Sequence, residues 1–229
     1  MTSDNSALLV AHGSPSDPAG QEAALAALAA KVQALAPGWR VGAATLAAEG
    51  AFDRAVAQLG RPLIYPYFMA EGYFTRRVLA PKSAALSLTQ AAPFGVEPAL
   101  IGVAATRLAE VVAAQGWAAS ETQLLIAAHG SAVSKRSKDS AYAFAEALKN
   151  AVGFASANVG LIEEPPYLAE VAKGMGRAVC LPFFALSSGH IEQDVPEALA
   201  NAGFCGPVLP PFIDWPETPA LIARHLLAR

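Results

Sequence analysis

Short apolar runs alternate along the chain with longer stretches rich in alanine and leucine. The short runs predict strands, because a strand that is buried on both faces is apolar throughout. The longer stretches predict helices, and the first should begin after Asp17, a capping residue that Pro18 follows at the first helical position. The predicted strands are 7–11, 40–45, 62–68, 96–101, 123–128, 157–162, 178–184 and 207–212, and two of the predicted helices are 18–35 and 140–152.

Alternating strands and helices are typical of an α/β fold with parallel sheets covered by helices on both faces. The chain also repeats itself, since LLVAHGS at 8–14 returns as LIAAHGS at 125–131. A second pair of similar segments is IYPYFMAEGYFTRRVL at 64–79 and CLPFFALSSGHIEQDVP at 180–196. We therefore predict two similar lobes, 1–116 and 117–229, each a mainly parallel sheet. The alternative is one continuous sheet in which the similarity is coincidental.

Composition narrows the class of protein without naming a function. The chain has 229 residues, of which 54% are apolar and 15% charged, enough for a core and too apolar for disorder. Its net charge of −3 gives no reason to expect nucleic acid or an anionic membrane as a partner. Two cysteines, no apolar stretch of membrane-spanning length and no signal-peptide pattern in the first ten residues predict a cytoplasmic protein.

Histidines and glutamates follow the predicted strands at the points where ligands bind in α/β sheets. His12 and His129 each follow the first strand of a half, and His190 follows the third strand of the second half. Glu163 and Glu164 follow its second strand, with either one a candidate. Two imidazoles and one carboxylate suit a divalent first-row metal held with an open coordination position. The alternative is a hydrogen-bonded histidine and a solvated strand end.

These motifs resemble those of the class II tetrapyrrole chelatases, and most closely the long, two-repeat form of the CbiX-type sirohydrochlorin chelatases. The resemblance rests on AHGS after a strand, a glutamate after the second strand, and GHIEQDVPEAL at 189–199. It implies a lyase that inserts cobalt or iron, with nickel as an alternative, into sirohydrochlorin for cobalamin or sirohaem biosynthesis, without a nucleotide. It also implies that His129, His190 and Glu163 are the catalytic and metal-binding residues.

The first half departs from this pattern. His12 is retained, but Tyr73 stands at the position of His190, and the alignment of the repeats sets Thr45 opposite Glu163 and Thr75 opposite Glu192. A neutral phenol is a poor ligand for these metals, because its pKa is about 10. We therefore expect a degenerate site in the first repeat and the metal site in the second.

Binding of a carboxylate-rich tetrapyrrole requires local cations in a chain that is acidic overall. Lys135, Arg136 and Lys138 follow the His129 loop, and Arg76, with its neighbour Arg77 and with Lys82, lies in the first half. Lys135, Arg136, Arg76 and the aromatic ring of Tyr73 are the substrate-binding candidates. The alternative for each cation is an ordinary solvated charge.

Two other functions compete with the chelatase hypothesis. The degenerate first repeat also suits a non-catalytic metal or tetrapyrrole carrier. A histidine-dependent phosphohydrolase is a weaker alternative, because Ala11 and Ala128 precede the histidines where such enzymes place an arginine. Two repeats in one chain favour a monomer, with a homodimer as the alternative.

Overall fold

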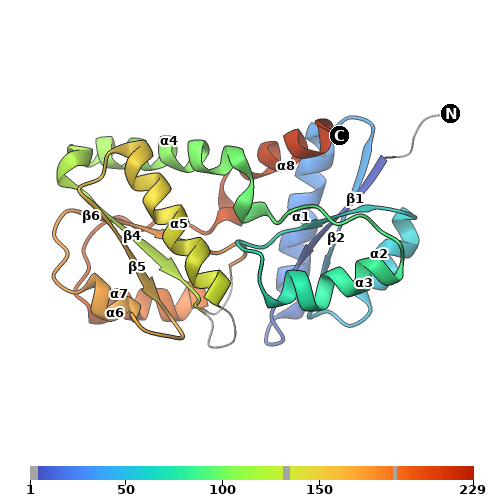
Figure 1. The fold of residues 1–229 in the computed structure, drawn as a ribbon, viewed down its shortest axis with the longest axis horizontal. Helices are drawn as coiled ribbons and strands as arrows, with labels where there is room; N and C mark the ends of the chain where they lie inside the picture. The colour runs from blue at the N-terminus through green and yellow to red at the C-terminus, as the bar shows by residue number, and fades with distance from the viewer. Residues whose placement is uncertain (1–4, 131–134, 188–189) are drawn as a thin grey trace. The chain divides into compact units, whose positions relative to one another are not determined.

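The computed structural model describes residues 5–130, 135–187 and 190–229, without the side chains of Lys135, Arg136 and His190. The chain forms two compact units (Figure 1). The first consists of Met1–Val96 together with Ile213–Arg229, and the second of Glu97–Phe212.

The first unit is built on a parallel sheet with strand order β2-β1-β3. Its central strand is buried almost completely on both faces, which explains why the sequence is apolar at every position from Ala7 to Ala11. Ala11 pairs with Thr45 at one end of the sheet, and Val10 pairs with Pro66. The strands are β1 (Asn5–Ala11), β2 (Trp39–Thr45) and β3 (Leu63–Pro66).

Helices cover this sheet as the sequence predicts. The Asp17 carboxylate accepts a hydrogen bond from the Gly20 N–H at 3.0 Å, and the helix begins at Pro18, so the predicted start is confirmed. Phe52 packs with Leu8 and Val10 in one apolar cluster. The helices are α1 (Pro18–Leu35), α2 (Ala51–Leu59), α3 (Ala80–Ala85), α8 (Thr218–Leu227) and a π-helix at Phe74–Leu79.

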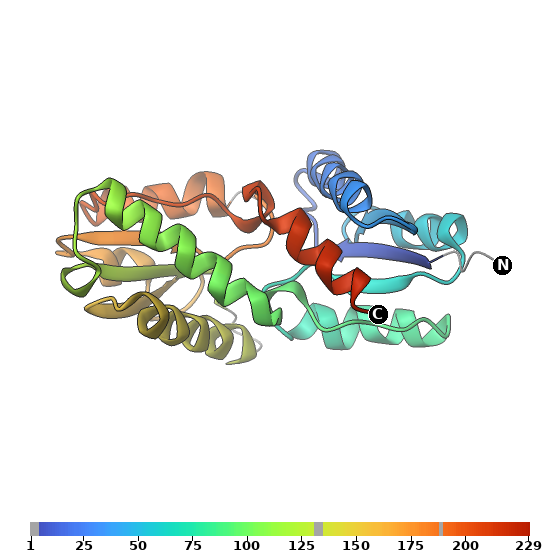
Figure 2. The same ribbon diagram turned by 90° about the horizontal axis from the view of Figure 1, so that it is seen from above.

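The second unit repeats this plan with strand order β5-β4-β6, all parallel. Leu125 and Ala127 of the central strand pack against α6 and α7, and Figure 2 shows α5 and α7 on opposite faces of the sheet. The two-lobed α/β fold is therefore confirmed. Its elements are α4 (Pro98–Ala114), β4 (Gln123–Ala128), α5 (Lys135–Val152), β5 (Ser156–Leu161), α6 (Leu168–Ala172), β6 (Ala178–Pro182), a π-helix at His190–Asp194 and α7 (Val195–Asn201).

The division by packing differs from the predicted division at 116/117. Helix α4 comes from the first repeat but packs against α5 and β6 of the second unit, and α8 comes from the second repeat but packs against α1. The repeats follow the order of the sequence, whereas the units follow the apolar faces that the helices bury.

Two predicted strands are wrong. The segment 96–101 contains the start of α4, where Pro98 occupies the first helical turn and Leu100 is buried. The segment 207–212 contributes an isolated bridge between Val208 and Cys180 and the first residue of a 3-10 helix at Phe212–Asp214. Both segments are short and apolar, and a run of that length does not distinguish a strand from the beginning of a buried helix.

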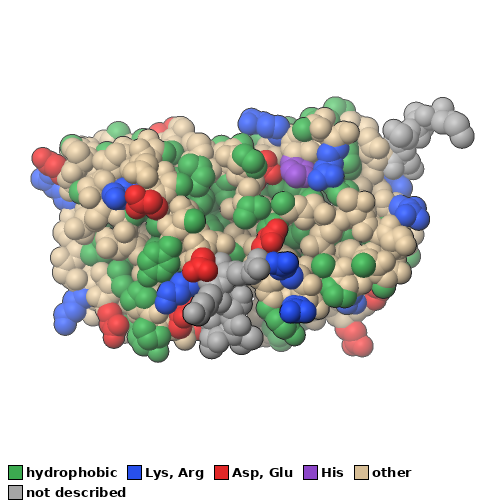
Figure 3. Space-filling model, viewed as in Figure 1, with side chains coloured by type: hydrophobic (Ala, Val, Ile, Leu, Met, Phe, Trp, Pro, Cys, Tyr) green, Lys and Arg blue, Asp and Glu red, His purple; other side chains and the backbone are tan. Residues whose placement is uncertain are grey.

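The surface is mixed in charge. On the face drawn in Figure 3, acidic and basic side chains of the described residues are interspersed among apolar and neutral ones. Within the described ranges, no helix has both the length and the apolar character to cross a membrane.

Candidate functional site

In each unit a histidine and a glycine follow the central strand of the sheet. His12 and Gly13 follow β1, and His129 and Gly130 follow β4. Both glycines have a positive φ, 77° and 78°, which side chains disfavour. A Cβ on Gly130 would lie 2.9 Å from Cγ of Glu164. The glycine therefore allows the chain to turn sharply behind the histidine and to approach the neighbouring turn closely.

His129 and Glu163 lie side by side beyond the carboxyl ends of β4 and β5. The two backbones are joined by a hydrogen bond from the Glu163 N–H to the His129 carbonyl oxygen, 3.0 Å long. The side chains approach to 3.7 Å between Nε2 of His129 and Oε1 of Glu163, and they are 42% and 47% exposed. The pair is accessible to a ligand.

The His129 ring is oriented by its own loop. Its Nδ1 lies 3.2 Å from the carbonyl oxygen of Gly130, and because a carbonyl oxygen only accepts, this bond places the proton on Nδ1. Nε2 is the ring nitrogen that faces the Glu163 carboxylate. With metal–ligand bonds of about 2.0–2.2 Å, one ion can reach both atoms. The arrangement suits an incomplete metal site or a proton shared between two bases.

The structure also separates the two candidate glutamates. Glu163 faces His129, whereas Oε2 of Glu164 lies 3.6 Å from Nζ of Lys138. The same ammonium group donates a hydrogen bond to the carbonyl oxygen of Pro165 at 2.8 Å. Sequence reasoning left this choice open, since both glutamates follow the same strand.

His190 is the first residue of the π-helix that follows β6, so its backbone lies on a segment leading from the strand next to β4. Its side chain is outside the described part of the chain, and the predicted approach of His190 to His129 stays a prediction. Among the described side chains, no group of three or more histidine, cysteine, aspartate or glutamate residues is placed to hold a metal ion. His129 and Glu163 are the described members of the predicted set.

The first unit lacks the carboxylate of this pair. The Ala47 N–H donates to the His12 carbonyl oxygen at 2.9 Å, which is the bond that Glu163 makes to His129. The structural counterpart of Glu163 is therefore Ala47, and the predicted correspondence with Thr45 is wrong. Thr45 is still inside β2, where it is fully buried and its N–H donates to the Glu22 carboxylate at 2.7 Å. The turn after β2 is one residue out of step with simple counting along the repeat.

An aromatic ring packs against His12, the histidine that follows the central strand of the first unit. The rings of His12 and Phe74 have centroids 3.9 Å apart, and Tyr73 meets Phe74 edge to face at 5.4 Å. Tyr73 is 52% exposed and directly precedes the π-helix that carries the exposed Arg76. The Thr75 hydroxyl donates to the Gly72 carbonyl oxygen at 3.1 Å, so it serves its own turn.

Of the predicted cations, Lys135 and Arg136 begin α5, and their side chains lie outside the described part. Lys138, one turn further on, is described and is bound to the glutamate turn. Sequence reasoning missed this contact, as well as the bond from Thr45 to Glu22. No short-range pattern indicates either one, because each joins a helix to a loop or strand distant in sequence.

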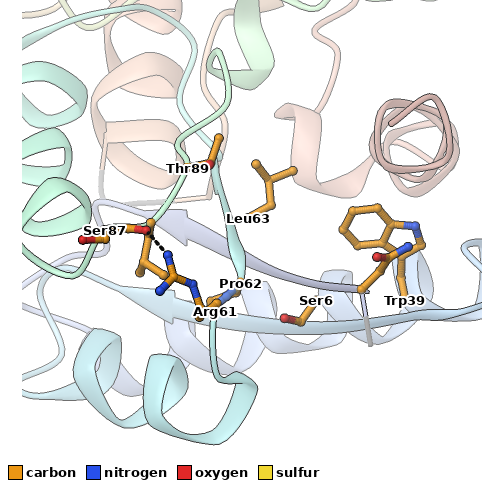
Figure 4. A pocket seen from close by; sticks show the side chains of 9 residues that line it. Ser6, Trp39, Arg61, Pro62, Leu63, Ser87 and Thr89 are labelled. Carbon is orange, nitrogen blue, oxygen red and sulfur yellow. Dashed lines mark hydrogen bonds between the residues drawn. The ribbon is translucent and has the colours of Figure 1, made fainter. Parts of the chain in front are cut away.

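A cavity of about 250 Å³ lies at the opposite, amino-terminal ends of the strands of the first unit (Figure 4). Arg61 borders it and donates a hydrogen bond to the Ser87 carbonyl oxygen at 2.8 Å. None of the candidate site residues lines this cavity, which separates it from the histidine-bearing edge. Its lining residues are Asn5, Ser6, Trp39, Arg61, Pro62, Leu63, Ser87, Leu88 and Thr89.

Comparison with known proteins gives consistent results. The CbiX family model matches residues 6–111 and 123–205. A CbiX structure, described as that of the terminal enzyme of sirohaem biosynthesis in denitrifying bacteria, is 43% identical, with a TM-score of 0.88 over 98% of both chains. No curated protein sequence is similar enough to the chain to count as a match.

Two more distant structures share the fold. SirB from Bacillus subtilis with Fe³⁺ is 16% identical, with a TM-score of 0.72 over 98% of this chain and 96% of that one. DR2241 from Deinococcus radiodurans, a multi-domain protein with structural similarity to chelatases, is 22% identical, with a TM-score of 0.70. The match covers 98% of this chain and 54% of DR2241.

Proposed function

The chain belongs to the CbiX family, and from this premise we propose that it is a metal chelatase that inserts a divalent metal ion into sirohydrochlorin. The metal is a substrate of the reaction, and cobalt(II) or iron(II) is the ion we favour. The product serves sirohaem or cobalamin biosynthesis. The observation that carries the proposal is the exposed pair of His129 and Glu163, 3.7 Å apart, beyond the ends of β4 and β5.

Metal insertion requires a site that binds the ion and then releases it. An imidazole nitrogen and a carboxylate oxygen are suitable ligands for cobalt or iron, and two or three protein ligands leave coordination positions open for pyrrole nitrogens. We assign this role to His129, Glu163 and His190. The 42% and 47% exposure of the two described side chains supports transfer, because a buried, fully ligated ion would exchange slowly.

Insertion also releases two protons, one from each of two pyrrole N–H groups, as the divalent ion replaces them. A base within hydrogen-bond reach accelerates such a step by about 100- to 10,000-fold. Glu163 and Nε2 of His129 are the bases that the site offers. No nucleotide takes part in this scheme, since the ion, the macrocycle and water balance the reaction.

The tetrapyrrole carboxylates require cationic partners, and we propose Lys135, Arg136 and Arg76, with the exposed ring of Tyr73 against the macrocycle. We further propose that the second repeat carries the chemistry. The first repeat offers an alanine, Ala47, in place of the carboxylate and a tyrosine in place of the second histidine. This loss equally supports a non-catalytic carrier as a second candidate function.

One experiment separates the two candidates. Anaerobic incubation with sirohydrochlorin and cobalt(II), iron(II) or nickel(II) is followed by the absorbance change of the metallated product. A chelatase accelerates this change above the protein-free rate, whereas a carrier binds metal or macrocycle without acceleration. His129→Ala and Glu163→Gln should each lower the rate by about 100-fold or more.

His12→Ala is the matched control for His129→Ala, because His12 occupies the same position after β1. It should have a modest effect. Loss of turnover in His12→Ala with full activity in His129→Ala would move the chemistry to the first repeat and overturn the site assignment.

A further inference from the structure

The two glutamates of the turn after β5 have different environments. Glu163 is 47% exposed and lies beside His129. Glu164 is only 23% exposed, and its carboxylate lies 3.6 Å from the ammonium group of Lys138, which is itself 29% exposed. Among the described contacts, Glu164 is paired with an ammonium group and Glu163 faces an imidazole.

Lys138 holds the turn at two points. Besides the contact with Glu164, its Nζ donates a hydrogen bond of 2.8 Å to the carbonyl oxygen of Pro165. Lys138 lies in the first turn of α5, so a long helix is connected directly to the turn that carries the glutamates. The Lys138 ammonium group therefore contacts the protein at two points as well as solvent.

Glu164 in turn packs on the histidine loop. Its Cγ lies 2.9 Å from the position that a Cβ on Gly130 would occupy. A series of contacts therefore runs from Lys138 to Glu164 and from Glu164 to Gly130, which is bonded to His129. This series of contacts links Lys138 to both members of the His129–Glu163 pair.

We propose that Lys138 is a positioning residue: by holding Glu164 and the Pro165 carbonyl, it leaves Glu163 as the carboxylate that faces His129. The proposal rests on the proposed function, since it assigns the work of metal binding and proton removal to that pair. Without Lys138, the turn loses a hydrogen bond and Glu164 loses its contact with the ammonium group, so Glu163 is held less firmly against His129.

The competing role for Lys138 is recognition of a substrate carboxylate. The two roles predict different kinetics. If Lys138 binds a substrate carboxylate, its removal should raise KM for sirohydrochlorin. If Lys138 orients the glutamate turn, its removal should lower kcat and weaken metal binding, with KM for sirohydrochlorin unchanged.

The test compares Lys138→Met with Lys138→Arg, which keeps a cationic donor. Lys138→Met should lower kcat by about 10- to 100-fold, the usual effect of losing a group that orients a metal ligand. Lys138→Arg should retain most of the wild-type kcat. The matched control is Lys149→Met on the same helix, where Lys149 pairs with Glu146 at 3.3 Å, and it should behave as wild type.

Titration with cobalt(II) alone, followed by its visible absorption, gives a readout that does not require turnover. Lys138→Met should bind cobalt(II) about 10-fold more weakly. Glu164→Gln, which preserves side-chain volume, should be non-additive with Lys138→Met in kcat, because the two substitutions remove one shared contact. This pair keeps the test decisive if Lys138→Met is poorly folded.

The possible failures are distinguishable. Wild-type kcat and cobalt(II) affinity in Lys138→Met, with Glu163→Gln inactive, would overturn the positioning role and leave the chelatase function intact. A raised KM for sirohydrochlorin with unchanged kcat in Lys138→Met would also overturn the positioning role, and would show that Lys138 recognises the substrate. If the wild-type chain does not accelerate metallation, the proposed function fails, and the cobalt(II) titration still decides whether Lys138 supports the pair.

Discussion

Gly130→Ala should destabilise the second unit and impair the site in one substitution. Gly130 has φ 78°, and a left-handed conformation costs a residue with a Cβ about 1–2 kcal/mol. The new methyl group would also lie 2.9 Å from Cγ of Glu164, 3.3 Å from its Oε1 and 3.4 Å from Cβ of Leu161. Overpacking of this kind costs about 1–3 kcal/mol, so we expect a total loss of about 2–5 kcal/mol in the free energy of unfolding.

Gly153→Ala separates the two contributions. Gly153 follows α5 in the same unit with φ 82°, but nothing lies within 4 Å of the position that its Cβ would take. This control should lose only the conformational cost of about 1–2 kcal/mol. Urea denaturation followed by far-UV circular dichroism gives both values.

Glu164→Ala provides a second check, because it removes the Cγ that the new methyl group meets. In the double variant Gly130→Ala/Glu164→Ala, the extra cost of Gly130→Ala relative to Gly153→Ala should largely disappear. Chelatase activity should fall in Gly130→Ala and remain at the wild-type level in Gly153→Ala. Equal destabilisation by the two glycine substitutions, together with wild-type activity in both, would refute the close contact between the histidine loop and Glu164.

Two further predictions concern burial. Burial raises the pKa of the Cys180 thiol from 9.0 to about 12. Between about pH 9 and 12 the folded state therefore keeps a proton that the unfolded state loses. The free energy of unfolding should fall over this range by up to about 1.4 kcal/mol per pH unit. Cys180→Ala should reduce that slope in urea titrations, and an unchanged slope would contradict the assignment. Leu226→Ala should cost about 2–5 kcal/mol, because Leu226 is fully buried on α8, whereas Leu227→Ala, with 53% exposure, should cost little; similar urea midpoints would argue against the packing of α8.

The positions of the histidines were predictable from the sequence. A strand buried on both faces is an unbroken apolar run, and the first polar residue after it marks the carboxyl end of the strand. His12 and His129 both satisfy this rule, and parallel strands bring such ends to one edge of the sheet. The capped start of α1 at Asp17 was predictable for a similar reason, since capping depends on residues a few positions apart.

The choice between the glutamates was not predictable in this way. Glu163 and Glu164 are adjacent in sequence, and one contact that distinguishes them is made by Lys138, which lies 26 positions before Glu164 on α5. The error at Thr45 has a related origin. Counting from His12 and His129 sets Leu46 opposite Glu163, and the backbone bonds of Ala47 and Glu163 show that the two halves differ by one residue before this point, so neither Thr45 nor Leu46 is the counterpart.

The exchange of α4 and α8 shows why a repeat in the sequence need not be a folding unit. Both helices end a repeat, and each buries its apolar face in the unit formed mainly by the other repeat. A fragment of residues 1–116 would lack α8, so the surface of α1 that packs on it would be exposed to water. The fragment 117–229 would lack α4, whose residues Leu100 and Leu108 are almost completely buried. Neither repeat alone therefore retains the full core of a unit. Because burial of such side chains contributes about 1.5–3 kcal/mol each, we expect each fragment to be less stable than the full chain.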